Sequence, residues 1–576
     1  MASEKKDFSA LCNFSLKVES LATPFVPMLN IKRYIFTGLL TGCLLSPPLL
    51  QANRYDSYTA RLQNNPHQAR VVSASYLGGS GTEWLVSGGF LPDGRVLLVG
   101  NALGPKLEIT GIEPLVIARN QQAINRRAPA APEPTPQRDR SGNVRTDSGG
   151  QPRLEPFSWQ HPNSTGFMVL LDRDMQRIQT ARRFPWQAGG ITSAVVTDDG
   201  YLLVTGPVGE RIGDIGGDYR RIEVAHEGRQ PGQIYLAKIK ADLTEVLWVR
   251  EFNGASSSPV VSISNDGDIY LEGPGLQVIS SAGERLREIP TGGRRLGNQS
   301  SVSPVTGKIA WGGERHWRTG REPWRCPRLN IFRPDGSHYL ELYHWPGPFV
   351  GTNYHRLVSD SAVRGVMFDR NGDLFIHAWS DGGNSVMVRQ PFDMYREHRK
   401  FEEGISYSIW GANVLSVAYI MRINPETWEV DAGMRYVGYL RDSNRPNGLS
   451  VDSLDLAHNG AVCVAGGSAW GFIQSPNSFF PETGGGPYIT VFDRDLTTIH
   501  FASLVLSAGT SVLREGRRWG VASGQVNGKT RILYLSGAVA ESTHYGTTAP
   551  APSVNPVQRG FGGGHLDGHF ILLELP

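Results

Sequence analysis

The stretch SAVVTDDGYLLVTG, residues 193–206, contains the clearest structural pattern in the sequence. Apolar side chains alternate with small or polar ones on both sides of Asp199-Gly200, and this is the period of a half-buried β-strand. Asp-Gly is a strong hairpin signal because a tight turn needs positive φ, which glycine adopts without steric cost. The stretch therefore predicts a strand, a two-residue turn that ends in glycine, and a second strand.

The same unit occurs seven times along the chain. VVSISNDGDIYLEG (260–273) and GVMFDRNGDLFIHA (365–378) are two further copies. A unit that recurs at intervals of this size is typical of a repeat architecture in which each copy builds one propeller blade. The Thr306 copy is the weakest, so six or eight blades are the alternatives. The predicted turns are Asp93-Gly94, Asp199-Gly200, Asp266-Gly267, Thr306-Gly307, Asn371-Gly372, Asn459-Gly460 and Asn527-Gly528.

A second type of hairpin lies between these units and occurs six times. One strand at each end of the chain remains without a partner: ARVVSASYLGG (69–79) near the start and HFILLELP (569–576) at the end. Pairing these two strands completes a seventh outer hairpin and removes the free edge between the first and last blades. The six outer hairpins span 167–184, 234–252, 276–289, 329–345, 419–437 and 488–505.

We therefore predict an all-β fold, a β-propeller of about seven four-stranded blades that is closed by pairing the N- and C-terminal strands in one blade. The 576-residue chain is longer than one ordinary core supports, which agrees with a repeat architecture. The propeller is expected to occupy 53–576. Residues 104–164 are rich in Pro, Arg and Gly and poor in apolar residues, and they are predicted to be a flexible insertion.

Residues 1–52 are predicted to be a leader that contains a signal peptide. In LNIKRYIFTGLLTGCLLSPPLLQA (29–52), Lys32-Arg33 precedes an apolar run that is too short for a good membrane span. Met28 is an alternative start. Cleavage after Ala52 would release a soluble protein, whereas cleavage before Cys43 would leave a lipid-anchored one. No transmembrane segment is expected after the signal, and the protein is expected to be extracytoplasmic.

The net charge bears on the kind of partner, and the cysteines bear on whether a disulfide forms. The 57 basic and 54 acidic residues give a net charge of +3, too small to indicate nucleic-acid binding. Cys326 and Cys463 remain after the leader, and the sequence leaves open whether they pair or stay as separate buried thiols. We expect a monomer without a cofactor, whose partner is a protein or an anionic glycan.

Two stretches resemble a known family. YLGGSG within SASYLGGSGTEWLVSGGFLPDGRVLLVGNA (73–102), and GGGHLDGHFILLELP (562–576), are similar to units of the bacterial SBBP-type β-propeller repeat family. GGGPYITVFDRDLTTIHFASLVLSAG (484–509) is a looser copy. The resemblance covers the blade pattern and not the long loops, and it implies an exported bacterial propeller. The family has no shared catalytic residues to transfer to this chain.

The loop 312–328 is the strongest candidate for a binding site. Guanidinium groups bind carboxylates and sulfates through two parallel hydrogen bonds, and indole faces stack on sugars or cations. This pattern indicates an anionic glycan or an acidic protein partner; a solvated basic loop fixed by two packed indoles is the alternative. The candidate binding residues are Arg315, Trp317, Arg318, Arg321, Trp324 and Arg325.

The region 343–384 holds the candidates for catalysis. His344, His355, Arg356 and His377 include the groups that could remove a proton beside a carboxylate, as in polysaccharide lyases, but their spacing matches no catalytic motif. We expect no metal site. The Asp369-x-Asn371-x-Asp373 spacing resembles the start of a calcium loop, yet it fits the predicted turn better.

The sequence thus favours an exported, non-catalytic binding protein whose ligand it does not identify. One alternative is a carbohydrate-active enzyme, either a polysaccharide lyase or a hydrolase, that uses the His344–His377 region. Another is a surface lipoprotein scaffold anchored through Cys43. Because propellers host many activities, the fold alone does not decide between these functions.

Overall fold

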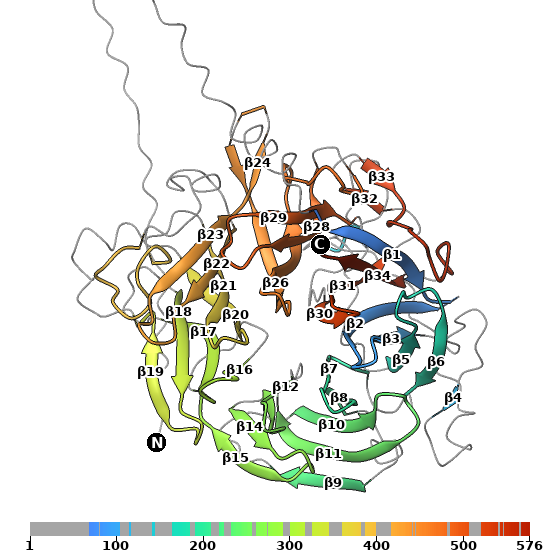
Figure 1. The fold of residues 1–576 in the computed structure, drawn as a ribbon, viewed down its shortest axis with the longest axis horizontal. Helices are drawn as coiled ribbons and strands as arrows, with labels where there is room; N and C mark the ends of the chain where they lie inside the picture. Colours follow the sequence, from blue (N-terminus) through green and yellow to red (C-terminus); the bar gives the residue numbers. More distant parts are fainter. Residues whose placement is uncertain are drawn as a thin grey trace, which may run out of the picture. The chain divides into compact units, whose positions relative to one another are not determined.

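A computed structural model shows the predicted β-propeller (Figure 1). No helix occurs in the described residues, and they therefore include no helix that is long and apolar enough to cross a membrane. The residues described are 68–79, 81–103, 115–116, 141–144, 164–184, 190–208, 218–223, 232–255, 261–272, 275–291, 300–316, 325–344, 360–381, 386–398, 416–440, 442–443, 445–480, 484–505, 520–538, 542–544, 547–563 and 566–576.

Each of the first three blades is an antiparallel sheet whose four strands follow one another outward from the centre. Blade 1 contains β2 (Thr82–Phe90), β3 (Val96–Leu103), β5 (Thr165–Leu171) and β6 (Ile178–Arg183). Blade 2 contains β7 (Ser193–Val196), β8 (Tyr201–Pro207), β10 (Gly232–Lys240) and β11 (Val246–Ala255). Blade 3 contains β12 (Val261–Ile263), β13 (Ile269–Glu272), β14 (Leu276–Ile279) and β15 (Arg285–Ile289).

Blades 4 to 6 repeat this order. Blade 4 contains β16 (Ser300–Val302), β17 (Ile309–His316), β18 (Arg325–Phe332) and β19 (His338–Leu342). Blade 5 contains β20 (Ser361–Phe368), β21 (Leu374–Ser380), β22 (Val417–Ile423) and β23 (Val430–Tyr436). Blade 6 contains β26 (Leu449–Leu456), β27 (Val462–Ser468), β28 (Gly486–Phe492) and β29 (Ile499–Leu504). Two short hairpins, β24 (Gly438–Leu440) with β25 (Arg445–Asn447) and β32 (Ser542–His544) with β33 (Thr547–Ala549), lie outside the blades.

Blade 7 closes the ring as predicted. Its inner strands are β30 (Gly520–Val526) and β31 (Lys529–Ala538), followed by β34 (Asp567–Glu574) near the C-terminus. The outermost strand is β1 (Arg70–Leu77) from the other end of the chain, which pairs antiparallel with β34. Figure 1 shows the blue first strand beside the red last one. Pairing the two ends leaves no open seam in the ring.

The seven predicted turn glycines all have positive φ, but the predicted turn length is wrong for six of them. Only Asn527-Gly528 is a two-residue loop, between β30 and β31. In five others the glycine amide donates to the carbonyl three residues earlier, as Gly94 does to Leu91. A type I turn followed by a left-handed glycine gives this longer loop. The Thr306-Gly307 turn contains one further residue, since Gly307 donates to Ser303.

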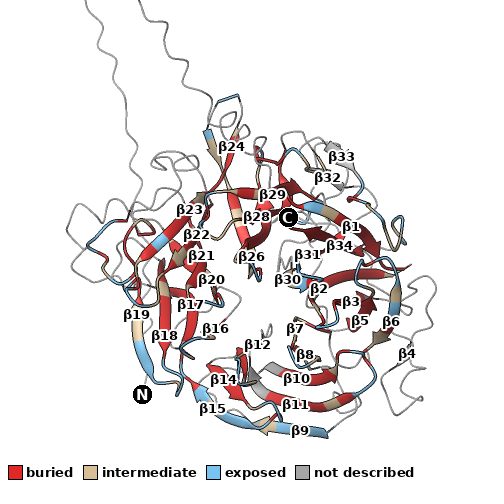
Figure 2. Ribbon diagram, in the orientation of Figure 1, coloured by how far each residue is buried: buried red, intermediate tan, exposed pale blue. Residues whose placement is uncertain are grey.

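The core consists of apolar layers between successive blades, and the layers appear as buried strands around the whole ring (Figure 2). Leu533 and Phe570 of blade 7, for example, share a buried cluster with Leu85 and Phe167 of blade 1. Both faces of each blade meet a neighbouring blade, so the two middle strands carry almost continuous buried runs. The stability of each blade therefore depends on its two neighbours.

Several connections between the second and third strands of a blade bind along the outer edge of that blade. Ala74 of β1 exchanges two backbone hydrogen bonds with Val554, at 2.7 and 2.9 Å. In blade 6, Ser475 donates to Ala502 of β29 in the same manner. Blades 1 and 2 gain short parallel strands, β4 (Leu115–Val116) beside β6 and β9 (Asp218–Glu223) beside β11. These segments cover edges that would otherwise be free to pair with another chain.

The insertion predicted at 104–164 lies outside the described residues, except for β4, residues 141–144 and Ser164. The leader predicted at 1–52 also lies outside them. Cys326 and Cys463 are free, buried thiols in blades 4 and 6, which resolves the question that the sequence left open.

Candidate functional site

The connections between strands are short on one face of the propeller, and the long connections lie on the other face. Turns between the first and second strands, and between the third and fourth, are short and share one face, which we call the turn face. All long connections run between the second and third strands or between blades, and antiparallel pairing places these on the opposite face. We call this the loop face. Variable loops on a rigid scaffold are where binding residues usually lie.

The loop predicted at 312–328 is shorter than expected, because residues 312–316 belong to β17 and 325–328 to β18, and these two strands pair with each other. Two predicted binding residues are described, and both lie at the loop-face ends of these blade 4 strands. Arg315 donates to both carboxylate oxygens of Glu341, at 2.7 and 2.9 Å. Arg325 binds Asp360 through Nε and through its backbone amide, each at 2.9 Å. Trp317, Arg318, Arg321 and Trp324 lie outside the described residues. The loop therefore leaves blade 4 between two arginines that are fixed by ion pairs.

The indole of Trp379 lies next to these ion pairs, and two guanidinium groups contact its ring. The guanidinium carbon of Arg325 is 5.2 Å from the ring centroid of Trp379, and that of Arg364 is 4.9 Å away. Arg364 is the extra residue of a β-bulge between Val363 and Gly365. A bulge changes the direction in which a side chain points. The sequence did not identify this group, because neither the bulge nor the approach of blade 4 to blade 5 follows from strand alternation.

The two described candidates for catalysis lie in different environments. His344 is 56% exposed just after β19, with Nδ1 3.3 Å from Arg315 and 3.6 Å from Glu341. His377 is buried in β21 of blade 5. Burial, with a contribution from Arg364, lowers the pKa of His377 to about 3, against a hydrogen bond to the backbone of Val451. His377 is thus buried and uncharged near neutral pH. His355 and Arg356 lie outside the described residues.

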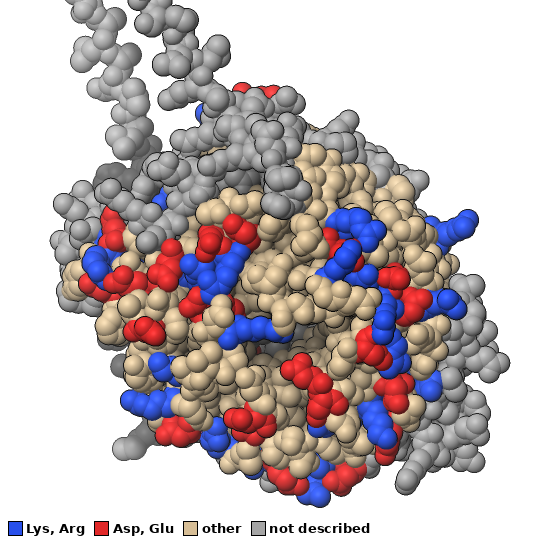
Figure 3. Space-filling view, viewed as in Figure 1, with Lys and Arg blue, Asp and Glu red and all other residues tan. Residues whose placement is uncertain are grey.

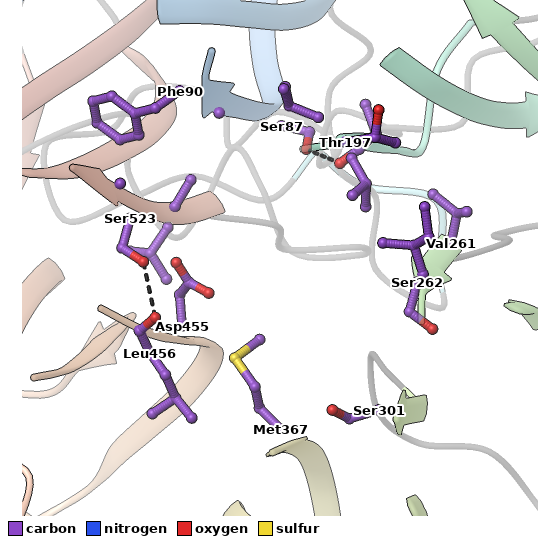
Figure 4. A pocket seen from close by; sticks show the side chains of 18 of the residues that line it. Ser87, Phe90, Thr197, Val261, Ser262, Ser301, Met367, Asp455, Leu456 and Ser523 are labelled. Carbon is purple, nitrogen blue, oxygen red and sulfur yellow. Dashed lines mark hydrogen bonds between the residues drawn. The ribbon is translucent and has the colours of Figure 1, made fainter. Parts of the chain in front are cut away.

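A central channel with a cavity of about 850 Å³ lies where the seven innermost strands meet. The view in Figure 3 shows the opening, with basic and acidic side chains interspersed around it. Hydroxyl groups are frequent in its wall. Of the predicted binding and catalytic residues, the four that the structure describes, Arg315, Arg325, His344 and His377, do not line it. Figure 4 shows Ser262, Ser301, Met367 and Asp455 pointing into this space.

The channel serines join neighbouring blades. Ser87 donates to the carbonyl of Ala194 at 2.7 Å, and Ser523 donates to that of Leu456 at 2.9 Å. Ser301 Oγ accepts the backbone amide of Phe368 at 2.9 Å. These three hydroxyls thus hold inner strands of neighbouring blades to one another.

Asp455 is the channel residue whose protonation is most strongly altered. Burial in the narrow channel raises the pKa of its carboxyl to about 6, although Ser523 and nearby backbone amides oppose the shift by hydrogen bonding to it. Asp455 pairs directly across the hairpin with Cys463, whose thiol pKa rises through burial and through the charge of Asp455. The alternating pattern of this hairpin gave no signal that a carboxylate would face the channel.

The Asp369-x-Asn371-x-Asp373 stretch is a turn, as the sequence favoured. Asp369 accepts the backbone amides of Asn371 and Asp373. Arg494 of blade 6 binds the carboxylates of both Asp369 and Asp373. An arginine therefore occupies the position where a calcium ion would be needed. Within the described ranges, no group of three or more metal-ligating side chains is present.

The strand order and the channel define the class of this protein: a seven-bladed β-propeller whose long loops share one face. No family model matches the chain, and no curated protein matches it. It is similar to a protein of unknown function from Dyadobacter fermentans DSM 18053, with 11% identity and a TM-score of 0.37, covering 89% of this chain and 100% of that one.

A member of the DUF4221 family from Bacteroides vulgatus ATCC 8482 is also similar, with 11% identity and a TM-score of 0.28. That similarity covers 70% of this chain and 93% of the other. At such low scores neither protein carries an argument about function. The fold assignment depends on the strand pairing of this chain alone.

Proposed function

We propose that this chain is an exported, non-catalytic binding protein that holds an anionic glycan or an acidic protein on its loop face. The observation that carries the proposal is that the long connections share that one face, including the connection between β17 and β18 in the basic stretch 312–328. A face built from long, dissimilar loops on a rigid ring is the usual arrangement for recognition.

Arg325 is the described residue best suited to bind an anion. Asp360 holds its Nε group, and its two Nη groups have no hydrogen-bond partner within the described part of the chain. The guanidinium is already fixed in position against Trp379. A fixed guanidinium loses little conformational freedom when it binds a carboxylate or a sulfate through its remaining donors. The adjacent indole offers a face on which a sugar ring can stack.

Export is supported by the order of basic and apolar residues before Ala52 and by the resemblance of 73–102 and 562–576 to the SBBP-type repeat. We propose an extracytoplasmic, monomeric protein that does not bind nucleic acid. The mature protein could instead be anchored to a membrane by a lipid on Cys43. Mass spectrometry of the mature N-terminus distinguishes the anchored form from the released one. A terminus near Asn53 without lipid identifies the released form.

Calorimetric titration of residues 53–576 with a sulfated and a carboxylated polysaccharide tests the proposal, with a neutral polysaccharide for comparison. Binding of an anionic chain should weaken at least about tenfold in Arg325→Ala and in the double variant Trp317→Ala/Trp324→Ala. Arg177→Ala, which removes an exposed arginine on the turn face of blade 1, is the control. Equal affinity for neutral and anionic chains, or equal loss in the control, would disprove anion recognition on the loop face.

A further inference from the structure

We infer that the closure of the ring contains a binding site for a hard divalent cation such as Ca²⁺, formed by Glu83 and Asp567 around Gly78. Glu83 lies at the start of β2 in blade 1, and Asp567 begins β34 in blade 7. Both side chains are completely buried, at 0% exposure. The site lies where the last blade meets the first, on the loop face. It does not depend on the proposed function.

The two carboxylates approach the same point. A Cβ atom on Gly78 would lie 2.6 Å from Asp567 Oδ1 and 3.0 Å from Glu83 Oε2. Any side chain at position 78 would therefore displace both carboxylates. This explains why the YLGGSG stretch has a glycine at this position. Two buried carboxylates that converge on a glycine resemble an oxygen-lined cation site more than an apolar contact.

Only one oxygen of each carboxylate accepts a hydrogen bond from the described residues. Asp567 Oδ2 accepts the side-chain amide of Gln558 at 2.9 Å and the backbone amide of Gly562 at 2.6 Å. Glu83 Oε2 accepts the amide of Gly79 at 3.3 Å. Asp567 Oδ1 and Glu83 Oε1 are buried, and neither has a hydrogen-bond partner in the described structure. Buried carboxylate oxygens without partners are costly, so this pair indicates a missing ligand.

The site also places two acidic groups beside one basic group. Glu83 and Asp567 are buried together, and the neighbouring cation that acts on Glu83 is Arg183. A divalent ion would balance the second carboxylate and would also take the unpaired oxygens as ligands.

The surroundings offer oxygen ligands of the kind that Ca²⁺ prefers. Because the site has two acidic side chains and not three, main-chain oxygens would complete the ligand set. Glycine-rich segments 78–79 and 560–563 bring such oxygens close: the carbonyl of Gly79 lies 2.8 Å from where a Cβ on Gly562 would be. An ion held here would connect β2 with β34, so its binding should stabilise the closed ring. The sequence alone predicted no metal site.

The test uses residues 53–576 after treatment with a chelator. Adding about 2 mM CaCl₂ should raise the thermal midpoint by at least about 3 °C. Tb³⁺ alone should bind one site per chain, with luminescence sensitised by Tyr76, whose pKa responds to the nearby charge of Asp567. Excess Ca²⁺ should displace it. Glu83→Gln and Asp567→Asn should lose both responses, whereas Asp455→Asn, which alters a channel carboxylate in blade 6, should keep them.

The measurements on the unaltered chain decide the question even if either variant fails to fold. No calcium-dependent shift and no stoichiometric Tb³⁺ binding would overturn the cation site. A response that survives in Glu83→Gln and Asp567→Asn would also overturn it. So would a loss of stability as the pH rises from 4.5 through about 8, if Glu83→Gln abolishes that loss and no metal response is seen. A proton shared between the two acids would then occupy the site. Loss of polysaccharide binding alone would leave this inference untouched.

Discussion

Arg70 and Glu574 lie directly opposite each other in the closing blade, and their side chains form an ion pair of 3.0 Å although they are 504 positions apart. Lys529 binds the same carboxylate at 2.8 Å, and Arg531 binds it at 3.1 Å from the strand on the other side. One carboxylate thus connects β1, β34 and β31. Its own side chain is only 5% exposed.

Glu574→Gln should lower the free energy of unfolding by about 1–3 kcal/mol, because three cations lose a charged partner. Burial alone would raise the pKa of Glu574, but hydrogen bonds from Lys529, Arg70 and Arg531 lower it from 4.5 to about 2. The stabilisation is therefore complete above pH 4.5 and is lost as the pH falls through about 2. Denaturant unfolding at several pH values should show this loss in the natural chain and not in the variant. Glu429→Gln, in an exposed pair with Arg396, should change little.

Gly365→Ala should destabilise the protein by about 1–3 kcal/mol through overpacking. A Cβ at this position would lie well inside 3.0 Å of Nε2 of His377, whose ring is buried and cannot move aside. Thermal unfolding measures the effect. Gly560→Ala is the control, because a Cβ there would meet no atom within 4 Å. Equal midpoints for the two variants would mean that His377 is free to move and is available for chemistry after all.

Asp455→Asn should stabilise the protein more at pH 8 than at pH 4, by about 1–3 kcal/mol. The pKa of Asp455 is raised from 3.8 to about 6, so the folded chain favours the neutral acid. The stability that this group contributes is complete below pH 3.8 and is lost as the pH rises through about 6. Asparagine resembles the neutral acid at every pH and avoids this loss. Unfolding free energies of both proteins at pH 4, 6 and 8 give the difference, and a constant difference across this range would contradict the prediction.

Deleting residues 52–77 should prevent the ring from closing, because β34 would then present a free edge where β1 pairs with it. We expect aggregation on size-exclusion chromatography. A circular permutant that joins Pro576 to Arg70 through a flexible linker, with new ends inside 104–164, should remain monomeric. An aggregated permutant with an intact β1 would show that closure needs more than strand pairing.

The blade framework followed from the sequence because it is locally encoded. The alternation around Asp199-Gly200 places apolar side chains on a sheet face, and ring closure requires a partner for the strand at 569–576. The hydrogen bonds of Ala74 with Val554 could not be predicted, since the covering segment has no periodic pattern. His377 was chosen for its chemistry, and its position in GVMFDRNGDLFIHA also predicts the buried strand in which it lies. Glu83 and Asp567 meet only because the two ends of the chain do.

The pairing of β1 with β34 also determines when the molecule can be completed. Of the blade strands, β1 is made first, yet its neighbour β34 is made after all the others. Until β34 is made, β1 is an apolar segment without its native partner, and segments of this kind are the ones that aggregate or require chaperones. Six blades can stack in order as they emerge, but the seventh cannot form until β34 has been made.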